Sequence, residues 1–287
     1  MNTRNLSTRI LSMVLVLVMV FGMVPFQAFS ADNAEAVDAA IIFTDLHTSS
    51  SNYKESTVKG VMTAMKNSGL PFSTVTSGGD AFSSNQSVST GYTDTITGYI
   101  RSALGTDLPV YYVWSDHDRG AYNNATEKVA LDKTSHMAYG AGNDGIYGTA
   151  DDGNYYIFSL SMADLSTNDR YNSGFHSDAQ VTQAIADFLA VAKTLDHSKP
   201  LFVASHMPLF ERRSDNGHAL EWFEAINEVA AEMDVAYFFG HNHSHDQAGD
   251  YFFAKGSTMT VETKSGSGSK QTLQDAVSTM YAIKPKN

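Results

Sequence analysis

The sequence contains no cysteine at all. It therefore excludes disulfide bonds, thiolate metal sites and a cysteine nucleophile. Any metal ion must be held by histidine, aspartate, glutamate, asparagine or backbone oxygen atoms. The metal chemistry open to this chain is that of nitrogen and oxygen ligands.

Basic residues are also few: 19 lysines and arginines stand against 31 aspartates and glutamates, giving a formal net charge of −12. This acidity argues against a nucleic-acid-binding surface and suits a protein that binds cations. Of the 287 residues, 43% are hydrophobic, enough to bury one sizeable core. We expect one large domain.

Long apolar runs are absent outside the first thirty residues. There, Arg4 and Arg9 precede an apolar run over residues 10–24, and small residues follow it. The pattern is typical of a secretory signal peptide at residues 1–30, and the run is shorter than the ~18 residues of a membrane span. We expect cleavage near Ala31 and a secreted or extracytoplasmic mature chain with no membrane span. An uncleaved anchor is the alternative.

The rest of the sequence alternates short apolar runs, typical of buried strands, with amphipathic segments, typical of helices. We expect strands at 39–43, 72–75, 108–114, 155–160, 201–204, 235–239, 252–254 and 259–262, and helices at 54–67, 92–103, 177–192 and 219–233. This order indicates an α/β fold with much of its sheet parallel. The domain spans residues 31–264, and residues 265–287 form a C-terminal tail or a truncated end of the domain.

Aspartates and histidines follow directly after five of the expected strands. They are Asp45 and His47, then Asp80, then Asp116, His117 and Asp118, then His206, and last His241 and His243. Because the carboxyl ends of parallel strands share one edge of a sheet, we expect these side chains to lie together. Imidazole with carboxylate suits Mn, Fe, Co, Ni or Zn, whereas a calcium site would use oxygen alone. The candidates outnumber the ligands of a single catalytic ion, so the sequence predicts two ions.

The order of these motifs resembles that of the calcineurin-like metallophosphoesterases. The motifs are Asp-x-His at 45–47, Gly-Asp at 79–80, His-Asp at 117–118, His-x-Pro at 206–208 and Gly-His-x-His at 240–243. Each is weak alone, and the specificity lies in five of them in this order, each after a strand. The resemblance covers about residues 39–255. It implies a four-layer α/β/β/α sandwich of two mixed β-sheets flanked by helices.

The resemblance also implies a role for each site residue. Two transition-metal ions are implied, both divalent or forming a mixed-valence pair. Asp45, His47 and His243 would hold one, Asp116, His206 and His241 would hold the other, and Asp80 would bridge them. A bridging water would become the nucleophile that attacks phosphorus. His117 would protonate the leaving group, and Asp118 would orient its imidazole.

The implied function is hydrolysis of a small phosphate ester, monoester or diester, outside the membrane, with phosphomonoesters or nucleotides as the default substrates. One residue departs from the family: Asp116 stands where asparagine is usual. A third carboxylate lowers the positive charge of the centre by one, so we expect tighter metal binding and a weaker Lewis acid. The alternative function is therefore a catalytically weak, metal-binding surface module on the same fold.

Other interpretations of single motifs stay open. Asp118, taken alone, could cap a turn. Arg212 and Arg213 either bind a substrate phosphate through bidentate hydrogen bonds or lie in a solvated loop. The Asp-rich and Gly-rich stretch 143–153 looks like calcium loops but lacks their spaced carboxylates, which favours turns. The His-x-His pair at 241–243 also occurs in metallo-β-lactamases and amidohydrolases, although there it comes early in the chain.

Replacing Asp116 with the family's asparagine tests the charge argument. We expect Asp116→Asn to bind metal ions more weakly and to shift the pH–rate profile to lower pH, because a centre with one carboxylate fewer makes the bridging water more acidic. Chelator competition and the pH dependence of ester hydrolysis measure the two effects. An unchanged metal content together with an unchanged pH profile would contradict the argument.

Overall fold

The computed structural model of the protein describes residues 39–45, 55–67, 69–81, 92–105, 108–115, 117–118, 133–166, 175–209, 217–241 and 249–253. The chain divides into two units, Met1–Val37 and Asp38–Asn287, and every described residue belongs to the second. The expected signal peptide and C-terminal tail lie outside the described residues. No helix among the described residues is long and apolar enough to cross a membrane.

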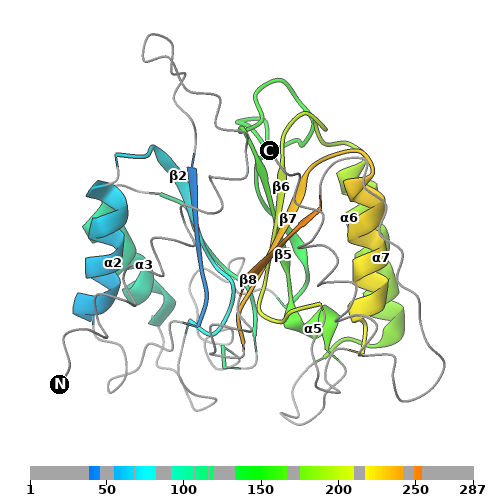
Figure 1. Ribbon diagram of the computed structural model, residues 1–287, viewed down its shortest axis with the longest axis horizontal. Coiled ribbons are helices and arrows are strands. Elements are labelled where there is room, and N and C mark those ends of the chain that lie inside the picture. The colour runs from blue at the N-terminus through cyan, green and yellow to red at the C-terminus, as the bar shows by residue number, and fades with distance from the viewer. Residues whose placement is uncertain are drawn as a thin grey trace, which may run out of the picture. The chain divides into compact units, whose positions relative to one another are not determined.

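Two β-sheets organise the second unit (Figure 1). The first has three parallel strands in the order β1 (Ala39–Phe43), β2 (Phe72–Ser77) and β3 (Val110–Tyr112). The second has the order β4 (His136–Tyr139), β5 (Tyr156–Leu160), β6 (Leu201–Ser205), β7 (Val235–Phe239) and β8 (Gly249–Phe253). Its three central strands are parallel, and β4 and β8 pair antiparallel at the edges.

Helices α2 (Glu55–Asn67) and α3 (Tyr92–Leu104) pack on the first sheet (Figure 1). In α2, Val58 and Met62 lie one turn apart, on the face that packs against β1 and β2. Parallel strands that follow one another in the chain require a long crossover connection, and α2 and α3 provide these connections between β1, β2 and β3.

The second sheet is covered by α6 (Asp178–Ala192) and α7 (Ala219–Ala230). Phe158 of β5, Phe188 of α6 and Trp222 of α7 form an aromatic cluster with ring centroids 4.6 to 5.9 Å apart. All three side chains are almost fully buried, so this cluster supplies a large part of the apolar area that holds the helices to the sheet.

The two sheets contact each other through a small third cluster that includes Val113, Tyr155, Ile157 and Ala204. The Tyr155 hydroxyl lies 2.5 Å from Oγ of Ser73 in β2, so a hydrogen bond joins the sheets. These contacts fix the position of the strand ends of one sheet relative to those of the other.

The structure confirms the expected mixed α/β fold and differs in detail. Strand β3 is shorter than expected because Trp114 leaves the sheet: its carbonyl accepts the Met162 N–H at 3.1 Å, and its ring is buried in the core of the second sheet. Strand β4 and the short helix α5 (Met162–Leu165) were not expected. Strand β8 begins earlier than expected, and the strand expected at 259–262 lies outside the described residues.

The Tyr156 hydroxyl, at the start of β5, makes hydrogen bonds to two neighbouring loops. It donates to Oδ2 of Asp152 at 2.6 Å and accepts the N–H of Asp196 at 3.1 Å. Burial and the neighbouring Asp152 carboxylate raise the pKa of Tyr156 from 10.0 to about 12. Both effects favour the neutral phenol in the folded state.

Tyr156→Phe is therefore expected to change both the stability and its pH dependence. At neutral pH it should lower the unfolding free energy by about 1.5 to 3 kcal/mol, because it removes a hydrogen bond to a charged group. A pKa raised by folding gives stability that is complete below pH 10.0 and lost as the pH rises through about 12. Urea unfolding should show a steeper loss over this range in the wild type than in the variant, and parallel curves would refute the assignment.

Candidate metal centre

Four candidate ligands lie just beyond the carboxyl ends of four parallel strands. Asp45 follows β1, Asp80 follows β2, His206 follows β6 directly, and His241 follows β7. Two of them come from each sheet. Because the sheets are in contact, the ends of their strands meet in one place, as expected for ligand sites of α/β proteins.

The ligand atoms of these residues lie at distances that fit a metal ion. One carboxylate oxygen of Asp45, one of Asp80 and a ring nitrogen of His206 all lie within 4.8 Å of one another. Nε2 of His206 is 3.3 Å from Oδ2 of Asp80 and 2.9 Å from Nδ1 of His241. Two atoms bound about 2.1 Å from one ion lie about 3.0 to 3.4 Å apart, so the Asp80–His206 spacing matches an edge of a coordination polyhedron and the His206–His241 spacing is close to one.

Burial sets the electrostatics of the centre. Asp80 is 1% exposed and His206 is fully buried. A buried carboxylate needs a cation or several hydrogen bonds, because otherwise its desolvation costs several kcal/mol.

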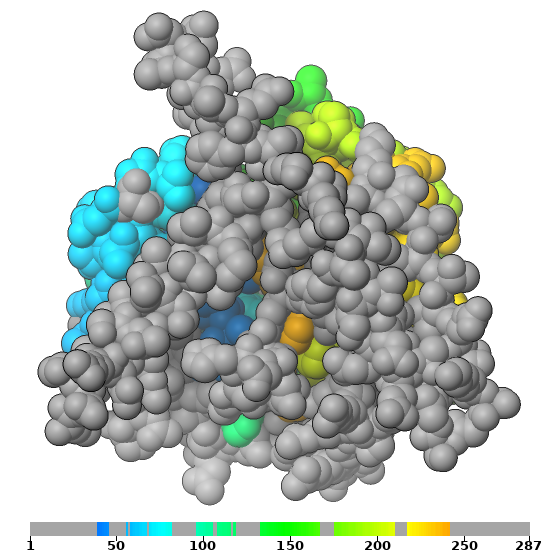
Figure 2. All heavy atoms as spheres, in the orientation of Figure 1, coloured from blue at the N-terminus to red at the C-terminus, as the bar shows by residue number. Residues whose placement is uncertain are grey.

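Figure 2 shows blue, yellow-green and gold atoms meeting on one face, which agrees with the short distances between residues far apart in the sequence.

The backbone is left-handed at three of the four candidate ligands. Asp45, Asp80 and His241 have φ values of 55°, 49° and 76°, and among the described residues they alone combine positive φ with a side chain. Such conformations are uncommon outside glycine and concentrate at functional sites. The same sharp turn after the strand thus aims each of the three side chains.

Glycines precede two of these ligands because the chain is crowded there. A Cβ atom on Gly79, where φ is 95°, would lie 2.8 Å from Cβ and 2.9 Å from the ring of His206. One on Gly240 would collide with the Asp45 carboxylate and with Thr44. The Gly-Asp and Gly-His motifs thus require glycine because the backbone there packs directly against a candidate ligand that follows another strand.

Hydrogen bonds orient the Asp45 carboxylate. The backbone N–H of His241 donates to Oδ2 at 3.0 Å and to Oδ1 at 3.2 Å, and the Thr44 hydroxyl donates to Oδ2 at 2.7 Å. One ligand thus holds another across the two sheets. Thr44 was not among the residues expected from the sequence, and only its position next to Asp45 hinted at its role.

The two residues expected to carry out proton transfer lie beside the ligands. Nε2 of His117 is 3.9 Å from Oδ2 of Asp80, and the His117 side chain is 31% exposed, so it can reach a bound molecule. Asp118 is fully buried and accepts the hydroxyl of Ser115 at 2.7 Å. That Asp118 orients the His117 imidazole stays a prediction.

The remaining predicted site residues lie outside the described residues. They are the metal ligands His47, Asp116 and His243 and the substrate-binding candidates Arg212 and Arg213. The described part of the centre thus holds four of the seven predicted metal ligands, contributed equally by the two sheets.

The stretch that resembled calcium loops is closed by its own hydrogen bonds. Asp151 accepts the N–H of Asn143 at 2.8 Å, and Asp152 accepts the N–H of Gly148 at 2.6 Å. Carboxylates used in this way stabilise turns, which agrees with the turn interpretation.

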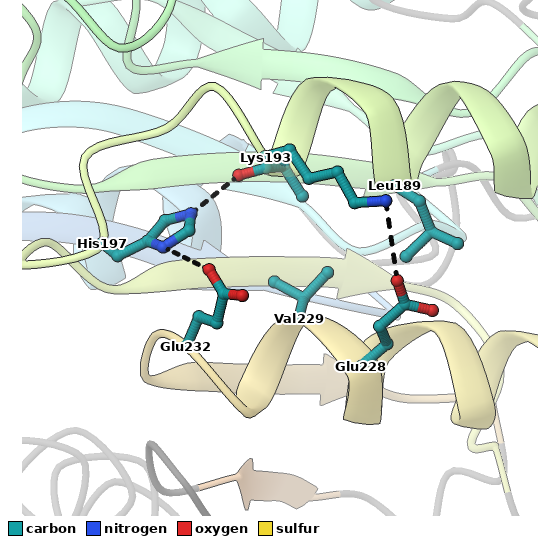
Figure 3. A pocket seen from close by; sticks show the side chains of 7 residues that line it. Leu189, Lys193, His197, Glu228, Val229 and Glu232 are labelled. Atoms are coloured by element: carbon teal, nitrogen blue, oxygen red, sulfur yellow. Dashed lines mark hydrogen bonds and ion pairs between the residues drawn. The ribbon is translucent and has the colours of Figure 1, made fainter.

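A pocket between the carboxyl-terminal parts of α6 and α7 is separate from the candidate centre (Figure 3). His197 pairs with Glu232 at 2.9 Å, and Lys193 lies 3.8 Å from Glu228. Because His197 precedes β6 whereas His206 follows it, the pocket lies toward the opposite end of the strands. Its polar side chains bind one another, so it offers no comparable ligand cluster.

Neither a scan against protein-family models nor a search of curated proteins finds a match for this chain.

Gly79→Ala tests the close packing of the centre, with Gly60→Ala in α2 as a matched control. We expect Gly79→Ala to weaken Mn²⁺ binding at least about tenfold, because the added methyl group displaces the His206 ring, and to lower the unfolding free energy by about 1 to 2 kcal/mol through its left-handed backbone. Gly60 is helical, and apart from its chain neighbours and its own helix backbone no described atom lies within 4 Å of the place that a methyl group would take there, so alanine should stabilise by up to about 1 kcal/mol.

Calorimetric titration with Mn²⁺ and urea unfolding measure the two effects of each glycine variant. Wild-type affinity in Gly79→Ala would mean that the His206 ring tolerates displacement and is not a ligand.

Proposed function

We propose that this protein is a metal-dependent phosphoesterase with a centre for two transition-metal ions. The observation that carries the proposal is the convergence of Asp45, Asp80, His206 and His241 at the carboxyl ends of four strands. Oxygen and nitrogen ligands in this mixture suit Mn, Fe, Co, Ni or Zn. The order of the sequence motifs, which resembles calcineurin-like enzymes, supplies the reaction class.

We further propose that the fold is the four-layer α/β/β/α sandwich of that family. The packing of α2 and α3 on the first sheet, of α6 and α7 on the second, and of Tyr155 between the sheets supports this arrangement. The parallel centre and antiparallel edges of the second sheet support its mixed character.

In this proposal Asp45, Asp80, His206 and His241 belong to the metal ligands, and His47, Asp116 and His243 complete the set. When bound, the two ions would polarise a phosphoryl oxygen and make water a better nucleophile. The chain's own contribution is orientation: Thr44 and the His241 N–H hold the Asp45 carboxylate, and Asp80 lies between the His206 and His117 rings.

His117 is proposed as the general acid. Its partly exposed imidazole has Nε2 3.9 Å from Oδ2 of the Asp80 carboxylate, beside the candidate ligands. From there Nε2 can pass its proton to the leaving oxygen of an ester, as general acids do at neutral pH. The proposed substrates are phosphate monoesters, including nucleotides, or diesters, met outside the membrane by a secreted chain.

Turnover measured with supplied metals tests the reaction class. Chelator-treated protein should hydrolyse p-nitrophenyl phosphate or its bis ester only after Mn, Fe, Co, Ni or Zn is added, with two ions bound per chain. Protein that binds two ions but turns over neither ester with any metal would instead be a metal-binding module.

His206→Ala should lower kcat/KM by at least about a hundredfold, because a lost ligand removes several kcal/mol of transition-state stabilisation. His197→Gln is the matched control, since His197 lies in the separate pocket of Figure 3, and its activity should equal that of the wild type. Metal content and steady-state kinetics of both variants decide the matter. Equal losses in the two variants would point to general destabilisation rather than to the site.

A further inference from the structure

The hydroxyl of Ser115 lies at the centre of a buried hydrogen-bond network next to the candidate ligands. Ser115 is fully buried. Its Oγ accepts the backbone N–H of Asp80 at 2.8 Å, and it lies 2.6 Å from Oδ1 of Asp80 and 2.7 Å from Oδ2 of Asp118. Three polar groups of two aspartates thus meet at one oxygen atom.

A hydroxyl group has one proton to donate and two lone pairs to accept. One lone pair of Ser115 is used by the Asp80 N–H, and the single proton faces two carboxylates. That proton is donated to one carboxylate at a time or shared between the two, and the Asp80 N–H anchors the hydroxyl in either case. Loss of the hydroxyl would therefore take from Asp80 both the acceptor of its N–H and a donor to its carboxylate, in a buried setting.

Within the network the two carboxylate oxygens of Asp80 have different partners. Oδ1 accepts the Ser115 hydroxyl and, at 3.3 Å, the N–H of His117. Oδ2 faces the ring nitrogen of His206 at 3.3 Å and that of His117 at 3.9 Å. With Oδ1 held in this way, rotation of the carboxylate is blocked and Oδ2 stays directed toward the other ligands.

We propose that Ser115 is the positioning residue of the metal centre, which fixes the Asp80 carboxylate and ties it to the buried Asp118. The inference rests on the proposed function only in that Asp80 must bind a cation. Groups that hold a metal ligand in this way commonly control metal affinity as strongly as some ligands do. Ser115 would thus act through Asp80 and touch neither the ion nor the substrate.

Metal binding by Ser115 variants tests the proposal without any assay of activity. The full chain, stripped with chelator, is titrated with Mn²⁺ by calorimetry, and the visible spectrum of the Co²⁺ form reports the coordination geometry. We expect Ser115→Ala to bind about 10 to 100 times more weakly than the wild type and to show altered Co²⁺ bands. Ser115→Thr keeps the hydroxyl and should restore binding to within about threefold.

Ser77→Ala is the matched control. Ser77 is equally buried, at the end of β2, and its hydroxyl makes no hydrogen bond within the described part of the chain. Its variant should keep the affinity and the Co²⁺ spectrum of the wild type. If Ser115→Ala does not fold, Ser115→Cys takes its place, because a thiol fills nearly the same space but is a weak donor; a loss of about 3- to 10-fold is then expected.

Each outcome bears on one proposal or on both. Wild-type affinity and spectrum in Ser115→Ala or Ser115→Cys, or equal losses in Ser115→Ala and Ser115→Thr, would overturn the role of Ser115. Metal binding with the expected order of variants, but no ester hydrolysis, would overturn the proposed function and leave the role of Ser115 intact. A wild-type chain that binds no ion would overturn both.

Discussion

The structure of the candidate centre depends on one constraint, which is that the Asp80 carboxylate lies out of contact with water. Burial of this charge is unfavourable unless donors or cations surround it. Its surroundings come from three strand ends: Ser115 and His117 after β3, His206 after β6, and its own left-handed turn after β2. The glycine at 79 is needed so that these groups can approach. The left-handed turn, the close packing at Gly79 and the surrounding donors therefore all act to position the Asp80 carboxylate.

The positions of the candidate ligands at the strand ends could be predicted because they depend on a short-range pattern. A run such as 201–205 is recognisable as a buried strand from its unbroken apolar residues, and the residue that follows it must lie at the sheet edge. Asp45, Asp80, His206 and His241 were found in this way. The resemblance to known phosphoesterases added the expected pairing of candidate ligands with ions, which periodicity alone does not supply.

The supporting contacts could not be predicted, because they join residues with no fixed spacing. Ser115 is one of many serines, and nothing in its neighbourhood marks a hydroxyl that binds two aspartates. The same is true of Asp164 in α5, which is fully buried and pairs with His176 at 2.6 Å and with Ser135 at 2.6 Å. The end of strand β3 could not be predicted either. Trp114 continues a run with strong strand propensity, but its ring is buried in the core of the second sheet and the residue lies outside the strand.

The hydrogen bond from the His241 N–H to Asp45 joins the end of a strand in one sheet to the end of a strand in the other. The candidate ligands are divided between the sheets in the same way, so an ion held by Asp80 and His206 would be a cross-link between the sheets. A cross-link that forms only in the native state stabilises it by mass action, by about 2.7 kcal/mol when the free ion is at one hundred times its dissociation constant. Resistance to unfolding would then follow the supply of metal ions, in a chain that has no cysteine and so no disulfide to cross-link it.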